Sequence, residues 1–242
     1  MGVLDGKVAL ITGAARGQGA EEARLFIAEG CRVAATDIDE AALRSQTKHD
    51  ALACWHHDVA EVEDWARVVA AVHDRFGPID ILINNAAMFL PNRFQETDRG
   101  QLDEHYRVNQ VGVFLGMQAV MGDMIAAARG SIINIASVAG LRASAGAFAY
   151  ATSKWAIRGM TKCAAVDLAD TGIRVNAIVP GLIDTAMMHR NPPERKAALI
   201  AGIPLGRPGN VYDVASAALY LASDASSYMT GAEIVIDGGA SG

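Results

Sequence analysis

The sequence predicts a single α/β domain in which helices cover both faces of a parallel sheet. Seven apolar runs of strand length recur along the 242 residues, and helix-length segments separate most of them. Strands that alternate with helices along a chain form parallel sheets. Hydrophobic residues make up 51% of the chain, which is enough for one sizeable core.

The first predicted strand, residues 7–12, leads into Gly13, Gly17 and Gly19 and then into a helix over residues 20–29. Glycines between a strand and a helix let the backbone approach a pyrophosphate, whose charge the helix N-terminus favours. The spacing Gly-x-x-x-Gly-x-Gly also suits a plain strand–helix turn. We interpret this stretch as a nucleotide-binding loop.

The second predicted strand, residues 32–37, ends on Asp37, 18 residues after Gly19. A carboxylate at that place can accept hydrogen bonds from the adenosine ribose hydroxyls, and its charge repels a 2′-phosphate. Arg16, within the glycine loop, is the opposing signal because it could pair with such a phosphate. The position of Asp37 therefore favours NAD over NADP, although a helix-capping aspartate is the alternative.

The third predicted strand, residues 51–57, ends at Asp58-Val59, where Asp58 is placed to meet the edge of an adenine. The neighbouring residues His56 and His57 point to opposite faces of a strand, so they are poorly placed to bind one metal ion. We expect no metal site. A helix over residues 61–76 follows.

The fourth predicted strand, residues 80–83, runs into the small and amide residues of 84–87, which suit a backbone close to a ligand. A long helix over residues 101–128 comes next. Asn109 is a poor helix former set in its apolar centre. Such a break in the local pattern marks either a functional residue or an asparagine bonded to a neighbouring helix.

The fifth predicted strand, residues 131–136, places Ser137 at its carboxyl end, where ligands of open α/β sheets bind. Tyr150 and Lys154 follow four residues apart, so on a helix they share one face. A nearby ammonium lowers the pKa of a phenol and makes it a proton-transfer group. The same spacing also suits a half-buried tyrosine beside a surface lysine.

The remaining elements are a strand over residues 174–179, a helix over 211–223 and a last strand over 233–237. Between them, residues 182–209 are rich in proline and methionine and contain one short helix at 193–201. A long, broken segment after a strand predicts a lid over the substrate.

Composition excludes several classes of protein. The net charge of −6 gives no sign of a nucleic-acid or anionic-membrane surface. Three separated cysteines fit reduced thiols of a cytoplasmic protein. The first residues show neither a signal region nor a myristoylation motif, and no run of 18 apolar residues predicts a membrane span.

Together these motifs resemble the short-chain dehydrogenase/reductase family over essentially the whole chain. The resemblance rests on the glycine loop Thr12–Gly19, Asn84–Ala87, Asn109, Ser137, the Tyr150-x-x-x-Lys154 pair, Pro180-Gly181 and the ending Thr230–Gly239. Ala87 departs from the glycine that is usual in the family. The resemblance implies a Rossmann-type doubly wound sheet with strand order 3-2-1-4-5-6-7, and homotetramers built through the 101–128 and 150–170 helices and the last helix and strand.

The resemblance also implies a role for each candidate residue. Tyr150 is the acid/base, Lys154 lowers its pKa, Ser137 fixes the substrate oxygen, and Asn109 holds a water that links Lys154 to solvent. Residues 180–185 would line the nicotinamide. The cofactor-binding residues implied are Gly13, Arg16, Gly17, Gln18, Gly19, Asp37, Ile38, Asp58, Val59, Asn85, Ala86, Ala87, Tyr150, Lys154, Pro180, Gly181, Ile183 and Thr185.

The expected reaction is hydride transfer between NAD(H) and a hydrophobic secondary alcohol or its ketone, of alicyclic or steroid-like type. An adaptable apolar pocket wall is expected from Met88, Phe89, Leu90, Leu141, Phe148, Met187 and Met188. Two alternatives stay open. One is an NADPH-dependent 3-oxoacyl-[acyl-carrier-protein] reductase on the same scaffold, and the other is an NAD-sensing scaffold protein without catalysis.

Overall fold

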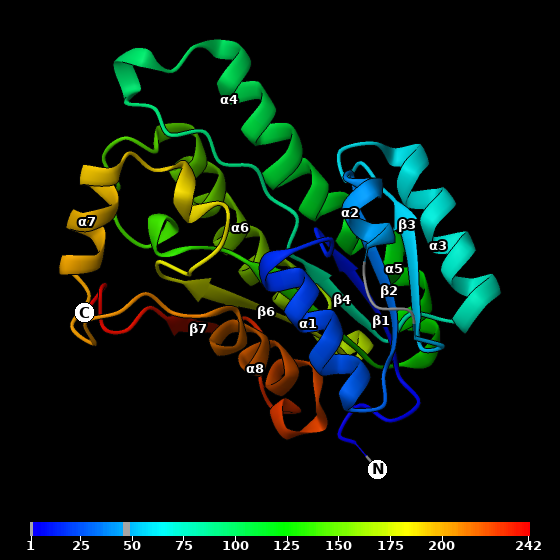
Figure 1. Cartoon of the computed structure of the whole chain (residues 1–242). Coiled ribbons are helices and arrows are strands. Elements are labelled where there is room, and N and C mark those ends of the chain that lie inside the picture. The colour runs from blue at the N-terminus through cyan, green and yellow to red at the C-terminus, as the bar shows by residue number, and fades with distance from the viewer. Residues whose placement is uncertain (1, 46–48) are drawn as a thin grey trace.

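The computed structural model describes residues 2–45 and 49–242, and its centre is a sheet of seven parallel strands. The strand order is β3-β2-β1-β4-β5-β6-β7, which confirms the predicted topology (Figure 1). The strands are β1 (Val8–Thr12), β2 (Arg32–Asp37), β3 (Leu52–His56), β4 (Ile81–Asn84), β5 (Gly130–Ile135), β6 (Ile173–Pro180) and β7 (Glu233–Ile236).

Helices cover both faces of this sheet and bury a separate core on each. Alternate residues of β1 serve the two cores, with Ala9 and Ile11 in one and Val8 and Leu10 in the other. The first core is closed by α1 (Gly17–Ala28), α2 (Glu40–Arg44) and α8 (Val211–Ala222), and the second by α3 (Val62–Phe76), α5 (Gly112–Ala127) and α6 (Phe148–Asp167).

Local sequence explains where several helices begin and end. Asn210 caps α8, because its side chain accepts from the Asp213 amide at 3.0 Å while the Asp213 carboxylate accepts from the Asn210 amide at 2.8 Å. Asp39 caps the short α2 with a single bond, its carboxylate accepting from the Ala42 amide at 3.0 Å. Gly77 ends α3 with a φ of 91°, a conformation that favours glycine.

The expected long helix is continuous but not uniform. It consists of α4 (Arg99–His105), a π-helical turn (Tyr106–Val111) and α5. The stretch Arg99–Ala127 is long enough and, on average, apolar enough to cross a membrane. The sequence did not predict this, because the stretch contains no unbroken run of 18 apolar residues. Met117, Val120 and Met124 on its inner side are buried in the core, as in the core helix of a globular domain.

Residues 182–209 form a loop whose two ends are bonded to each other. The Gly209 amide donates to the Leu182 carbonyl at 2.9 Å, and the Asp184 amide donates to the Gly209 carbonyl at 2.9 Å. The loop contains α7 (Pro193–Ala201), as predicted. Short 3-10 turns lie at Phe94–Glu96, Val138–Gly140, Ala169–Thr171, Met188–Arg190 and Asp224–Ser226.

Candidate active site

A cavity of about 800 Å³ lies beyond the carboxyl ends of the strands. Residues that follow β1, β2, β4, β5 and β6 all contribute to its wall, which is where ligands of open α/β sheets bind. Apart from Gly19 and Asn109, every predicted site residue lines it. The set is Gly13, Arg16, Gly17, Gln18, Asp37, Ile38, Asp58, Val59, Asn85, Ala86, Ala87, Ser137, Tyr150, Lys154, Pro180, Gly181, Ile183 and Thr185.

The glycine loop is shaped to let the chain pass close to a ligand. Gly13 and Gly17 have φ values of 64° and 61°, in the left-handed region that favours glycine. A Cβ on Gly19 would lie 2.5 Å from the Gly13 carbonyl oxygen. Gly19 is therefore needed for the close packing of the turn, although it does not itself line the cavity. The N-cap residue Arg16 makes no side-chain hydrogen bond to the first turn of α1, which leaves amide donors for an anion such as a pyrophosphate. These residues fit a dinucleotide.

Asp37 lies at one end of the cavity and is held by the backbone. Its carboxylate accepts from the Ala15 amide at 3.1 Å and from the Asp39 amide at 3.0 Å. The Arg16 guanidinium forms an ion pair with the neighbouring carboxylate of Asp39. The two residues that gave opposing signals for the cofactor are therefore both fixed near the end of β2.

Tyr150 and Lys154 lie side by side on the first half of α6 and face the cavity. The Lys154 Nζ atom is 5.6 Å from the centroid of the Tyr150 ring and donates to the Ile135 carbonyl at 2.7 Å. The Tyr150 ring packs edge-on against Phe89, with 5.0 Å between centroids. Ser137, from the end of β5, shares the same wall.

Burial controls the ionisation of this pair. It raises the pKa of the Tyr150 phenol, and a hydrogen bond with Ser137 opposes that rise. It also lowers the pKa of Lys154 to about 7. Loss of solvent is thus the larger influence on the pKa of Tyr150 in this structure, and the expectation that Lys154 lowers it stays a prediction.

Comparison with known proteins agrees with this geometry. The family profile described as Enoyl-(Acyl carrier protein) reductase matches residues 13–241. The chain belongs to the short-chain dehydrogenase/reductase family. It is thus an oxidoreductase that acts on CH–OH groups of small molecules and uses a nicotinamide dinucleotide.

Named relatives cover nearly the whole chain. The 3-alpha-(or 20-beta)-hydroxysteroid dehydrogenase of Mycobacterium tuberculosis is 40% identical over 98% of this chain and 90% of its own length. The trans-4-hydroxycyclohexanecarboxylate dehydrogenase of Sinomonas cyclohexanicum is 40% identical over 96% and 92%. The 3-oxoacyl-[acyl-carrier-protein] reductase of Thermotoga maritima is 40% identical over 98% of each chain.

Asn109 supports the wall of this dehydrogenase from behind. It lies fully buried in the π-helical turn, and its side chain accepts from the Met88 amide at 2.8 Å. It also donates to the Met88 carbonyl and to the Ser153 hydroxyl, both at 3.0 Å. The amide thus ties the segment after β4 to α6, while its role in holding a water stays a prediction.

Sequence reasoning missed several residues of the cavity. Arg107 lines it and donates to Asp58 at 3.1 Å, a contact between positions 49 residues apart. His57 also lines it, and burial lowers its pKa to about 4, so it is neutral at pH 7. The other lining residues that were not predicted include Glu104, Val108, Ile135, Ala136, Ala186, Arg190 and Asn191. The sequence signal that could have indicated Arg107 is its place two residues before the anomalous Asn109.

The expected apolar wall is only partly present. Met88, Phe89, Met187 and Met188 line the cavity. Leu90, Leu141 and Phe148 do not, because Leu141 packs against a hydrophobic core, the Phe148 ring packs against Phe94, and Leu90 is partly exposed. Among residues 2–45 and 49–242, no group of three His, Cys, Asp or Glu side chains could hold a metal ion.

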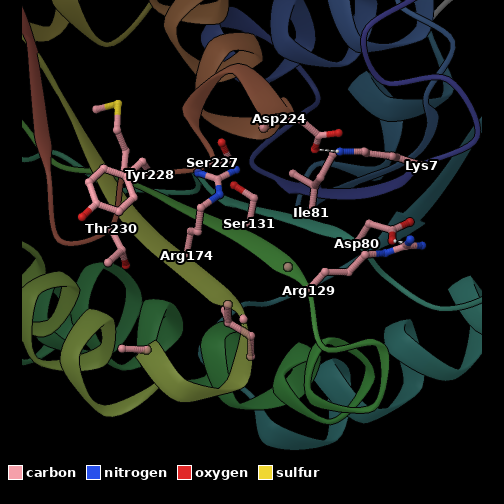
Figure 2. A pocket seen from close by; sticks show the side chains of 16 residues that line it. Lys7, Asp80, Ile81, Arg129, Ser131, Arg174, Asp224, Ser227, Tyr228 and Thr230 are labelled. Carbon is pink, nitrogen blue, oxygen red and sulfur yellow. Dashed lines mark hydrogen bonds and ion pairs between the residues drawn. The ribbon is translucent and has the colours of Figure 1, made fainter.

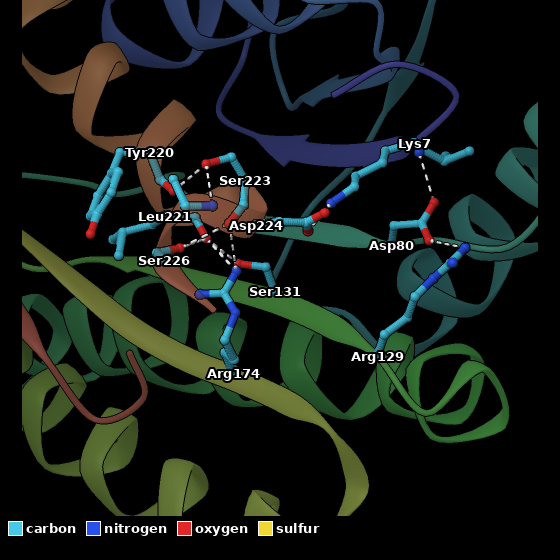
Figure 3. Close-up of polar contacts among 12 residues, drawn as sticks. Lys7, Asp80, Arg129, Ser131, Arg174, Tyr220, Leu221, Ser223, Asp224 and Ser226 are labelled. Carbon is cyan, nitrogen blue, oxygen red and sulfur yellow. Dashed lines mark hydrogen bonds and ion pairs between the residues drawn. The ribbon is translucent and has the colours of Figure 1, made fainter. Parts of the chain in front are cut away.

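A second cavity, of about 570 Å³, lies at the amino ends of the strands and holds none of the predicted site residues (Figure 2). Its polar groups bond mainly to one another. Lys7 pairs with Asp224 at 2.8 Å and Arg129 with Asp80 at 3.2 Å. Arg174 donates to the Leu221 carbonyl at 2.7 Å and so caps the C-terminus of α8 (Figure 3). These contacts indicate a structural role.

Proposed function

We propose that this dehydrogenase oxidises a hydrophobic secondary alcohol, of alicyclic or steroid-like type, and reduces the matching ketone. The observation that carries the proposal is the convergence of Ser137, Tyr150 and Lys154 on the wall of a cavity that Met88, Phe89, Met187 and Met188 also line. The names of the hydroxysteroid and hydroxycyclohexanecarboxylate dehydrogenases support the same substrate class.

Each of these residues has a proposed task. The nicotinamide dinucleotide supplies the hydride acceptor when bound. Tyr150 takes the proton from the substrate hydroxyl, and Ser137 donates a hydrogen bond that holds the substrate oxygen beside the phenol. Lys154 binds the nicotinamide ribose and passes the proton onward. Its pKa of about 7 suits a group that exchanges protons near neutral pH.

We propose that NAD is preferred over NADP. The Asp37 carboxylate lines the cavity at the end of β2, and Arg16, the cation that could have bound a 2′-phosphate, is paired with Asp39. The adenosine would lie against Ile38, Asp58 and Val59. Thr185 lies close to the glycine loop, because a Cβ placed on Gly17 would be 3.6 Å from the Thr185 methyl carbon.

Asp37→Ala tests this preference. We expect kcat/KM with NAD to fall and the discrimination against NADP to relax, because the ribose acceptor and the repelling charge are removed together. Kinetics with both cofactors on one alcohol measure it. Asp74→Ala, a change of an exposed aspartate on α3 outside the cavity, is the control. Unchanged discrimination in Asp37→Ala would count against the assignment.

Three further features belong to this proposal. Residues 182–209 act as a substrate lid, which their mutually bonded ends at Leu182 and Gly209 support. The protein works in the cytoplasm. It assembles as a homotetramer, in which the apolar side chains exposed on α5 and α6 meet another subunit.

An acyl-carrier reductase is the second candidate, because a relative with that name is 40% identical. A panel of secondary alcohols with NAD, run beside an acyl-carrier thioester with NADPH, separates the two. We expect turnover of cyclohexanols or hydroxysteroids with NAD. Turnover of the thioester alone would transfer the assignment to the reductase, and cofactor binding without any turnover would favour the NAD-sensing scaffold.

A further inference from the structure

Arg190 differs from the other arginines in the cavity wall. Arg16 is paired with Asp39, and Arg107 is paired with Asp58. Within residues 2–45 and 49–242, Arg190 has no carboxylate at ion-pair distance, and its guanidinium donates instead to the Phe89 carbonyl at 3.3 Å. Arg190 is exposed, and a neutral carbonyl does not neutralise its charge, so the other N–H donors of the guanidinium are open to solvent or to a ligand. The cavity therefore has an unpaired cation in its wall.

The acidic side chains of the wall lie at the opposite end of the cavity. Asp58 and Glu104 gather around Arg107, and Asp37 lies at the end of β2. On the lid, Asp184 pairs with His189 at 3.4 Å and does not line the cavity. Among the described residues, none of these carboxylates forms an ion pair with Arg190.

The backbone that carries Arg190 is held in place. The next residue, Asn191, is buried, and its side-chain amide donates to the Met188 carbonyl at 3.0 Å. The Arg190 amide donates to the Met187 carbonyl at 3.2 Å. Both methionines line the cavity. A charged side chain whose backbone is held in this way loses less conformational freedom on binding a ligand than one on a free loop.

Phe89 relates this cation to the reacting centre. Its ring packs against Tyr150 with 5.0 Å between centroids, and its carbonyl oxygen accepts from Arg190. Tyr150 and Arg190 therefore both contact Phe89, one through its ring and the other through its carbonyl oxygen, and all three residues line the cavity. A substrate whose hydroxyl meets Tyr150 can extend across Phe89 and bring its far end to Arg190.

We propose that Arg190 binds a carboxylate on the substrate, remote from the carbon that is oxidised. The preferred substrates are then hydroxy acids with an apolar ring between the two groups, rather than neutral alcohols. This inference rests on the proposed function, since it concerns the same site. Arg190 acts in specificity, because it touches the far end of the substrate and not the reacting atoms.

The test compares an acid with its uncharged amide. We expect wild type to oxidise 4-hydroxycyclohexanecarboxylate with a kcat/KM about 10-fold or more above that for 4-hydroxycyclohexanecarboxamide, because a hydrogen bond to a charged group is the stronger one. Arg190→Gln should lower kcat/KM for the acid by about 10- to 100-fold. The same substitution should leave kcat/KM for the amide and the KM for NAD unchanged. Arg142→Gln, an exposed arginine outside the cavity, should behave as wild type.

A binding measurement keeps this test separate from that of the proposed function. Cyclohexanecarboxylate, which has no hydroxyl to oxidise, is titrated into the NADH complex and followed by NADH fluorescence. Loss of its binding in Arg190→Gln, with cyclohexanecarboxamide unaffected, supports the carboxylate site even if no alcohol is turned over. Equal binding of the acid to wild type and Arg190→Gln would overturn it, and turnover of neutral alcohols would still leave the proposed function standing.

Discussion

Glu22 shows how one residue can link the fold to pH. Its side chain on α1 is fully buried, and neither carboxyl oxygen has a hydrogen-bond partner in the described part of the chain. Burial without a partner disfavours the charged form and raises the pKa of Glu22 to about 8. The folded protein therefore keeps a proton on this carboxyl at pH values where the unfolded chain has lost it.

We expect Glu22→Gln to gain stability relative to wild type as the pH rises from the ordinary pKa of 4.5 to about 8. In that window the folded state binds more protons at Glu22 than the unfolded state, so the free energy of unfolding of wild type falls with pH. The gain should level off on the order of a few kcal/mol. Urea unfolding at several pH values measures it, with the exposed Glu63→Gln as control. A difference that does not depend on pH would contradict the assignment.

The glycine loop and the helix it starts form the element on which the cofactor site depends. A Cβ on Gly19 would lie 2.5 Å from the Gly13 carbonyl oxygen and 2.6 Å from the Asn85 amide nitrogen, so the turn and the end of β4 would have to move apart. Gly122, within α5, has nothing within 4 Å of the same position. The two glycines allow a matched comparison.

We expect Gly19→Ala to lose about 1–3 kcal/mol of stability through overpacking. It should also weaken NADH binding, because the loop backbone shifts. Gly122→Ala should instead gain about 0.5–1 kcal/mol, since alanine is the better helix former. Thermal unfolding and NADH fluorescence titration report both effects. Normal NADH affinity in Gly19→Ala would show that the loop does not hold the dinucleotide.

Elements were predictable from the sequence where local signals were strong. All seven strands were found, and the helix at 193–201 matches α7 residue for residue. The short α2 was missed because its five residues offer no periodicity. The roles of Arg107 and His57 could not be read from the chain, since their partners Asp58 and Thr36 lie 49 and 21 positions away. Burial likewise lowers the pKa of Lys154, and the depth of burial of a side chain cannot be read from the Tyr-x-x-x-Lys motif.

The whole molecule leaves apolar side chains uncovered on one side of the sheet. Val166 is 77% exposed and Trp155 49% exposed on α6, and Phe114 and Ile125 are each 45% exposed on α5. Both helices cover the same face of the sheet (Figure 1). An exposed apolar surface of this kind fits the proposed contact with another copy of the chain.

Val166→Glu should lower the oligomer mass measured by light scattering, because a carboxylate placed in an apolar contact loses its hydration without a partner. Its circular dichroism spectrum should stay that of wild type. Val62→Glu, a matched change at a 59% exposed position on α3, should leave the mass unchanged. If Val166→Glu keeps the wild-type mass, α6 does not contribute to the assembly.

The central claim is that the Tyr150 phenol exchanges the proton of the substrate hydroxyl. Tyr150→Phe removes only that oxygen and keeps the ring against Phe89, so turnover and cofactor binding can be separated. We predict that kcat falls by about 10²- to 10⁴-fold while NADH binds as in wild type, with Tyr212→Phe on α8 as control. Turnover close to wild type in Tyr150→Phe would contradict the mechanism.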